Sequence, residues 1–373
     1  MKFFTKNCFT EANRLATAGR YAEAMGRLQA RRGSQTVAPP MDFASPTNLF
    51  APKFGFQSLP GARDITSALR SLPTREPGTA KLLPAGARFE EHSFVNAAGA
   101  RSYKLYVPSG YRQEALPLFV MLHGCRQSPD DFAAGTRMNE LAEARGFLVA
   151  YPSQPASANP SRCWNWFNVG DQERDRGEPS IVAGVTRQIM SDCAVDPARV
   201  YIVGLSAGGA AASVMAATYP DLYAAVGVHS GLACGAARDA NSAFAAMRQG
   251  ASHPREGSVN SVPTIVFHGD RDMVVSPING DQVIAQFKSA TAARRSVVHG
   301  RSDGGVSYTC STEADSNGRP TSEHWVLHGA GHAWSGGSPG GSYTDPRGPD
   351  ASSEMVRFFL DGAGREAARA SPE

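Results

Sequence analysis

Short, almost continuously apolar runs alternate with segments of helical periodicity from residue 87 onward. The apolar runs predict strands, and the periodic segments predict helices. The expected strands are Ser102 to Val107, Leu118 to Leu122, Phe147 to Tyr151, Val200 to Val203, Ala225 to His229, Thr264 to Phe267 and His324 to Leu327. The expected helices are Asp131 to Arg145, Ser180 to Cys193, Ala207 to Tyr219, Gly280 to Ala293 and Ser352 to Leu360. This alternation is typical of an α/β fold whose mostly parallel sheet carries helices on both faces.

The first 86 residues follow a different pattern. Apolar residues recur at helical spacing between residues 8 and 32, with an interruption near Gly19, which predicts a short helical N-terminal extension. Residues 33–86 hold eight prolines and show no sustained periodicity, which is typical of a linker. We therefore expect an amphipathic helical segment at 1–32, a Pro-rich linker at 33–86, an α/β domain at 87–365 and a disordered tail at 366–373.

A serine lies at the junction of a predicted strand and a predicted helix. The segment Gly204-Leu205-Ser206-Ala207-Gly208 follows the apolar run Arg199 to Val203 and leads into the small-residue stretch after Gly208. A serine displayed on so sharp a turn leaves no room for side chains two positions before and after it, which explains both glycines. The G-x-S-x-G pattern in this context predicts a nucleophile elbow with Ser206 as the nucleophile.

Two later segments supply the partners that a serine nucleophile needs. A serine hydroxyl requires a histidine to accept its proton and an acid to orient that histidine. Asp270 and Asp272 both follow the predicted strand that ends at Phe267, and a glycine-rich loop after Leu327 carries His332. We expect Asp272 to be the acid, with Asp270 as the alternative, and His332 to be the base. The order Ser, Asp, His along the chain is that of α/β-hydrolases.

An acyl-transfer site also needs N–H donors that face the developing oxyanion. The backbone N–H of Ala207 is one expected donor. The other is expected from the loop after the strand that ends at Leu122, where the sequence is His123-Gly124-Cys125. We assign the second donor to the N–H of Cys125 and expect His123 to shape the oxyanion loop.

Four spaced motifs resemble those of a known family. They are His123-Gly124-Cys125, Cys163-Trp164-Asn165-Trp166-Phe167, Gly204-Leu205-Ser206-Ala207-Gly208-Gly209 and Gly331-His332-Ala333-Trp334-Ser335-Gly336-Gly337. Together they resemble the polyhydroxybutyrate depolymerase family of esterases, which also includes feruloyl and acetyl-xylan esterases. The likeness extends from about Phe89 to Asp361. It implies an α/β-hydrolase fold and a serine carboxylesterase whose triad is Ser206, Asp272 and His332.

The resemblance also implies a class of substrate and a reaction that needs no metal and no organic cofactor. We expect the protein to hydrolyse poly(3-hydroxybutyrate) or its oligomers through an acyl-enzyme. The alternative substrate class is plant-derived esters of the feruloyl or acetyl-xylan type. A non-catalytic granule-associated protein with a hydrolase fold is a third alternative, which is disfavoured because every catalytic position is filled.

Charge and hydropathy narrow the choice of partners and location. The 37 basic and 34 acidic residues leave a formal charge of only +3, which gives no reason to expect nucleic acid as a partner. No apolar run approaches the ~18 residues of a membrane span, and the first residues lack the apolar core of a secretory signal. We therefore expect a cytoplasmic protein. The basic segment 1–32 is expected to contact a polyester granule surface, or alternatively to pack on the main domain or mediate oligomers.

The six cysteines and the tryptophans leave alternatives open. No two cysteines have C-x-x-C spacing, so a zinc site is not expected. The family resemblance implies that Cys125 and Cys163 lie close together, either as a disulfide or as small apolar residues. Trp164, Trp166 and Trp334 are expected either to contact substrate or to pack in the core. His229, His268 and His328 are expected to have structural roles.

Overall fold

A ten-stranded sheet forms the centre of the protein in the computed structural model, which describes residues 83–252 and 262–362. The strand order is β1-β2-β4-β3-β5-β6-β7-β10-β9-β8. The strands are β1 (Arg88–Asn96), β2 (Gly99–Val107), β3 (Leu116–Leu122), β4 (Leu148–Pro152), β5 (Val195–Leu205), β6 (Ala225–His229), β7 (Thr264–Gly269), β8 (Arg294–Arg301), β9 (Ser307–Ala314) and β10 (Pro320–Leu327). A separate parallel pair joins β11 (Trp334–Ser335) to β12 (Thr344–Asp345).

The middle of the sheet is parallel and its edges are antiparallel. Neighbouring strands run parallel from β4 through β3, β5, β6 and β7 to β10. Strands β1 and β2 at one edge and β9 and β8 at the other pair in the antiparallel sense. The predicted α/β fold with a mostly parallel sheet is therefore confirmed.

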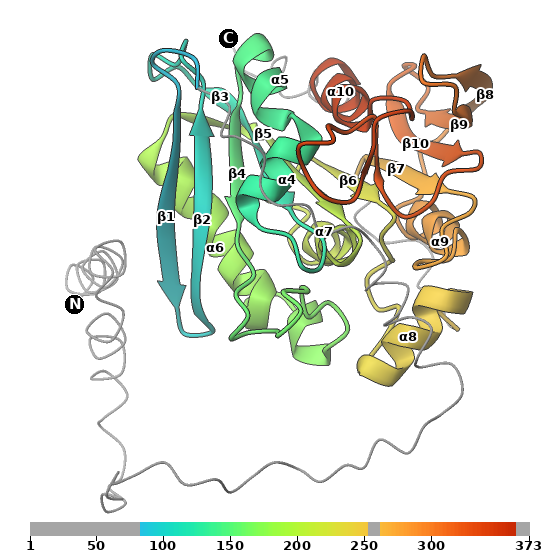
Figure 1. The fold of residues 1–373 in the computed structure, drawn as a ribbon, viewed down its shortest axis with the longest axis horizontal. Helices are drawn as coiled ribbons and strands as arrows, with labels where there is room; N and C mark the ends of the chain where they lie inside the picture. The colour runs from blue at the N-terminus through green and yellow to red at the C-terminus, as the bar shows by residue number, and fades with distance from the viewer. Residues whose placement is uncertain (1–82, 253–261, 363–373) are drawn as a thin grey trace, which may run out of the picture. The chain divides into compact units, whose positions relative to one another are not determined.

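Helices cover both faces of the sheet (Figure 1). They are α4 (Pro129–Thr136), α5 (Met138–Arg145), α6 (Gly177–Asp192), α7 (Ala207–Thr218), α8 (Ala240–Gln249), α9 (Ile278–Gln286) and α10 (Ala351–Arg357), with short helical turns at Val169–Gln172 and Phe358–Gly362. Side chains alternate along each strand, so the sheet contributes to two cores. In β3, Leu118 and Val120 pack with α6, α7 and α9 on one face, whereas Phe119 and Met121 pack with α4, α5 and α10 on the other.

Several predicted elements need correction. The helix expected over Asp131 to Arg145 is two helices, because Arg137 takes a left-handed conformation (φ 55°) and hydrogen-bonds Gly336 O and the Asp350 carboxylate through its guanidinium. The helix expected to reach Ala293 ends at Gln286. Strands β1, β8 and β9 and helix α8 were not predicted. Of these, β8 is exposed along almost its whole length, so it lacks the apolar alternation that marks a strand.

Some predictions fall outside the described residues. They concern the amphipathic segment at 1–32, nearly all of the linker at 33–86 and the tail at 366–373. Within residues 83–252 and 262–362, no helix combines the length and apolar character needed to cross a membrane.

Candidate active site

Ser206 occupies the turn between β5 and α7. Its backbone has φ 57° and ψ −119°, a conformation that L side chains rarely adopt and that marks a strained turn. A Cβ on Gly204 would collide with the backbone of Gly208, and a Cβ on Gly208 would collide with the carbonyl of Leu122. The Ser206 N–H donates to His229 O at 2.9 Å, which ties the turn to the end of β6. The sharp strand-to-helix turn predicted from the sequence is therefore present, and the role of Ser206 as nucleophile stays a prediction.

Asp272 and His332 form a buried pair beyond the carboxyl ends of β7 and β10. Asp272 Oδ2 lies 2.7 Å from His332 Nδ1, and their side chains are 0% and 6% exposed. Asp272 Oδ1 accepts the N–H groups of Val274 and Val275, each at 2.9 Å. Burial by itself would raise the pKa of Asp272, but the charge of His332 and hydrogen bonds from His268 and His332 hold that pKa well below its usual range. The acid is therefore ionised and fixed, as an orienting carboxylate requires.

Asp270, the alternative acid, has a different partner. Its carboxylate lies 3.0 Å from His328 Nδ1 and accepts the Gly329 N–H at 2.7 Å. The Arg271 N–H donates to Ala330 O at 3.0 Å, so the two loops after β7 and β10 are joined by backbone as well as side chains. This geometry favours Asp272 as the acid and gives Asp270 the task of holding the loop that carries His332.

The structure brings two of the three predicted triad residues into hydrogen-bond contact. Within the described part of the chain, no hydrogen bond joins Ser206 Oγ to His332. Strands β5, β6, β7 and β10 are consecutive and parallel, so Ser206, Asp272 and His332 all follow carboxyl ends at one edge of the sheet. Hydrogen bonds between nucleophile and base are often long in free enzymes and shorten when substrate binds.

The loop after β3 lies directly against the elbow. A Cβ on Gly208 would also meet the carbonyl of His123, so the two backbones are in contact. The Gly124 N–H donates to Gln127 Oε1 and the Arg126 N–H to Ser161 O, whereas the Cys125 N–H has no acceptor among the described residues. Ala207 is the first residue of α7, and N–H groups there have no partner within the helix. The two predicted oxyanion donors thus lie on adjoining backbones, and their role stays a prediction.

His123 holds this loop through its buried ring. Its Nε2 accepts the Gln154 N–H at 3.1 Å, so the proton is on Nδ1, which donates to Gly124 O at 2.7 Å. Burial lowers the pKa of His123 to about 4, which keeps the ring neutral near pH 7. The ring therefore holds the loop after β3 through backbone groups on both of its nitrogens, and the part of this loop in an oxyanion hole stays a prediction.

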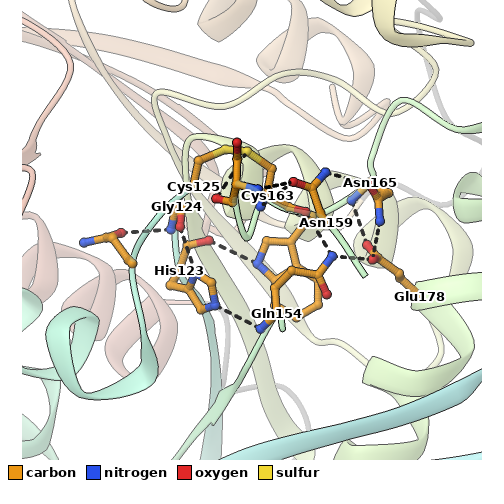
Figure 2. Close-up of a disulfide and its surroundings, with 11 residues drawn as sticks. His123, Gly124, Cys125, Gln154, Asn159, Cys163, Asn165 and Glu178 are labelled. Carbon is orange, nitrogen blue, oxygen red and sulfur yellow. Dashed lines mark hydrogen bonds between the residues drawn. A yellow bond between two sulfur atoms is a disulfide. The ribbon is translucent and has the colours of Figure 1, made fainter. Parts of the chain in front are cut away.

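A disulfide joins Cys125 to Cys163, the pairing that the sequence left open (Figure 2). It connects the loop after β3 to the segment after β4 across a separation of 38 residues. The Trp164 indole donates to His123 O at 3.1 Å beside it. Cys125, which carries the expected second oxyanion donor, is thus held by the disulfide and by the hydrogen bonds of its neighbours Gly124 and Arg126.

Comparison with known families identifies the chain. The family model described as esterase PHB depolymerase matches residues 101–303, which is more than half of the 373 residues. The chain belongs to this family. This polyhydroxybutyrate (PHB) depolymerase-family protein contains the elbow, the loop after β3 and the Asp272 turn within the matched region.

Individual relatives agree with this assignment. The family member is 33% identical to poly(3-hydroxyalkanoate) depolymerase C of Paucimonas lemoignei over 250 residues, covering 64% of this chain but only 59% of that protein. It is 28% identical to feruloyl esterase B of Thermothelomyces thermophilus, covering 50% of this chain and 68% of that protein. The solved acetyl xylan esterase from Aspergillus awamori superposes with a TM-score of 0.54 at 19% identity, covering 69% of this chain and 93% of that one. This likeness confirms the α/β-hydrolase fold.

A buried polar network in this family member was missed by sequence reasoning. Glu178 Oε2 accepts the Asn165 N–H at 2.8 Å, and Oε1 lies 2.5 Å from Gln154 Nε2 (Figure 2). Oε1 also lies 3.2 Å from Arg101 Nη2. Gln154 Nε2 also donates to Cys163 O at 2.9 Å. Burial raises the pKa of Glu178. The network fixes the segment that carries Cys163 and Asn165. No local motif connects residues so distant in sequence.

The tryptophans of this protein lie inside it. Trp164 and Trp334 are each 1% exposed and Trp166 is 6% exposed. Trp334 stacks on His229 and donates to Ser352 Oγ at 3.0 Å. Burial of this extent favours packing, the alternative weighed for all three, and their predicted contact with substrate stays a prediction. His229, expected to have a structural role, accepts the Ser335 N–H at 3.0 Å.

Proposed function

We propose that this protein is a serine ester hydrolase that uses Ser206 as nucleophile, His332 as base and Asp272 as the orienting acid. The observation that carries the proposal is the buried Asp272–His332 pair at the same sheet edge as a serine on a strained elbow. Membership of a family of esterases supports the same reaction class.

The first half of the reaction forms an acyl-enzyme. His332 takes the proton of Ser206 Oγ as the oxygen attacks the ester carbonyl carbon. The N–H groups of Ala207 and Cys125 then face the negative oxygen, and donors of this kind contribute about 3 to 4 kcal/mol each to transition-state stability. The tetrahedral intermediate collapses when the alcohol leaves with the proton from His332.

The second half releases the acid. Water loses a proton to His332 and attacks the acyl-enzyme, and Ser206 departs with that proton to restore the free enzyme. Asp272 stays ionised throughout and stabilises the imidazolium in both steps, which agrees with its lowered pKa. Each half therefore needs the same three side chains and the same two N–H donors.

We favour poly(3-hydroxybutyrate) or its oligomers as the substrate. The support is the 33% identity to a poly(3-hydroxyalkanoate) depolymerase. Plant phenolic or acetyl esters are the second candidate, because feruloyl and acetyl xylan esterases are also among the similar proteins. Contact of the basic N-terminal segment with a polyester granule remains part of the proposal and concerns residues outside those described.

The Cys125–Cys163 disulfide bears on the cellular location of the protein. The sequence predicts a cytoplasmic location. A disulfide between Cys125 and Cys163 is an observation against it, because such bonds are rare in the cytosol.

A direct comparison of substrates tests the proposal. Wild type and Ser206→Ala are incubated with amorphous poly(3-hydroxybutyrate) granules and, separately, with methyl ferulate. Release of 3-hydroxybutyrate that requires Ser206 is the expected result. Release of ferulate alone would keep the reaction class and move the substrate to plant esters, and hydrolysis unaffected by Ser206→Ala would refute the proposed nucleophile.

A further inference from the structure

The carboxylate that holds His332 has a second imidazole next to it. His268 is the second-last residue of strand β7, and its Nε2 lies 2.9 Å from Val275 O and 3.5 Å from Asp272 Oδ2. The carbonyl Val275 O can only accept, so the proton of a neutral His268 ring is on Nε2, and Asp272 Oδ2 lies beside the same N–H. Asp272 Oδ2 is also the oxygen that contacts His332. One carboxylate oxygen therefore faces N–H groups from two buried histidines.

A glycine in α9 makes room for the His268 ring. His268 lies opposite Val326 on the neighbouring parallel strand β10, and His324 lies opposite Val266, so both rings are on the same face of the sheet. Helix α9 packs over β7 and β10 on this face. A Cβ on Gly280 would be 3.0 Å from His268 Nδ1 and 3.1 Å from His324 Nε2. The two nitrogens therefore face the same point, which any larger residue would occupy.

These two nitrogens are buried without a hydrogen-bond partner in the described part of the chain. A buried polar atom without a partner costs free energy, so a pair of them beside the candidate site requires an explanation. The other nitrogen of His324 lies 3.6 Å from Asp281 Oδ1 at the start of α9. Burial lowers the pKa of His324 to about 4, so this ring is neutral near pH 7.

We propose that His268 is a positioning residue for the acid of the triad, and that His324 and Gly280 hold the His268 ring against Asp272. The proposal rests on the proposed function, because it takes Asp272 as the acid that orients His332. In this arrangement the His268 N–H orients one carboxylate oxygen and takes up part of its charge. The titratable groups around His268 are Asp272, His332, His229 and His324, with Asp281 beside His324.

Removal of the His268 side chain is expected to change how strongly the charged Asp272 carboxylate holds the proton of His332. Without the His268 N–H, Asp272 Oδ2 faces His332 alone, and the imidazolium of His332 is held more tightly. His332 then keeps its proton to a higher pH, so the acid limb of the kcat/KM profile moves upward. A residue with only a packing role would change the melting temperature or KM and leave the acid limb in place.

Two substitutions at position 268 separate these roles. His268→Leu keeps an apolar side chain of similar size without a donor, whereas a glutamine carries an amide N–H close to the position of Nε2. For His268→Leu we expect kcat to fall about tenfold with KM within about twofold and the acid limb to rise by about half a pH unit. His268→Gln is expected to return the acid limb to its wild-type position.

A third variant acts on the ring from outside the triad. Gly280→Ala places a methyl group against His268 Nδ1 and is expected to shift the acid limb in the same direction as His268→Leu. Gly110→Ala is the matched control, because nothing lies within 4 Å of a Cβ at that position. If His268→Leu does not fold, Gly280→Ala decides the question by its acid limb.

The outcomes distinguish this inference from the proposed function. Suppose that Ser206→Ala abolishes hydrolysis. The inference would then be overturned if the acid limb of the kcat/KM profile stays at its wild-type pH in both His268→Leu and Gly280→Ala. Hydrolysis that survives Ser206→Ala would overturn the proposed function and this inference with it.

Discussion

Two buried neutral histidines make the folded protein sensitive to mild acid. Burial lowers the pKa of His123 to about 4 and that of His229 to about 3, the latter with added repulsion from His268 and His332. Their pKa in the unfolded chain is about 6.5. The unfolded state therefore binds protons that the folded state rejects, so the stability from these groups is present above pH 6.5 and is lost as the pH falls toward the folded values.

The size of the effect follows from the size of these shifts. Between pH 7 and pH 5 each of the two histidines lowers the free energy of unfolding by about 2 kcal/mol. The reason is that at pH 5 the imidazole is mostly protonated in the unfolded chain and mostly neutral in the folded protein. These two groups together are expected to lower the free energy of unfolding by about 4 kcal/mol, as measured by urea titrations at both pH values and constant salt. The buried His324 acts in the same direction.

A variant isolates the contribution of His123. His123→Asn carries a side-chain N–H near the position of Nδ1 and cannot titrate, so its loss of stability between pH 7 and pH 5 is expected to be about 2 kcal/mol smaller than in wild type. His299→Gln, on the exposed strand β8, is the matched control and is expected to follow the wild type. The same pH dependence in wild type and His123→Asn would refute the reasoning.

Three further predictions concern the elbow, the disulfide and the N-terminus. Gly208→Ala is expected to lower the free energy of unfolding by at least about 2 kcal/mol and to lower kcat. Gly110→Ala is the control and is expected to change neither quantity. Equal stability of the two variants would contradict the close packing at the elbow. Reduction of the protein should expose two additional thiols, from Cys125 and Cys163, and an unchanged thiol count would exclude the disulfide. Loss of this disulfide, which closes a loop of 38 residues, should lower the free energy of unfolding by about 4 kcal/mol. Deletion of residues 1–82 should weaken sedimentation with polyester granules, and equal binding would refute the anchoring proposal.

The sequence predicts the centre of this fold because the central strands are buried on both faces. Strands such as β3 and β6 appear as unbroken apolar runs, and the elbow has a local signature in Gly204 and Gly208. The elements that were missed lack such a signal. Helix α8 is amphipathic, but it spans only ten residues and buries only two alanines. Strand β8 is exposed along most of its length and lacks the apolar alternation that marks a strand.

The site could be predicted only as far as its motifs extend. Local sequence places a serine, two candidate acids and a histidine after successive strands. The sequence already favours Asp272 over Asp270, and the structure adds the physical reason, because Asp270 contacts His328 whereas Asp272 contacts His332. The network of Arg101, Gln154 and Glu178 joins residues from three separate elements, and a single sequence holds no record of such contacts.

Covalent capture of the nucleophile tests the central claim most directly. The protein is treated with a fluorophosphonate, which reacts with activated serines, and the modified peptide is located by mass spectrometry. The account predicts one adduct per chain, on Ser206, with its rate of formation strongly reduced by His332→Ala and no adduct in Ser206→Ala. An adduct on another residue, or an equal rate in His332→Ala, would contradict the assignment of nucleophile and base.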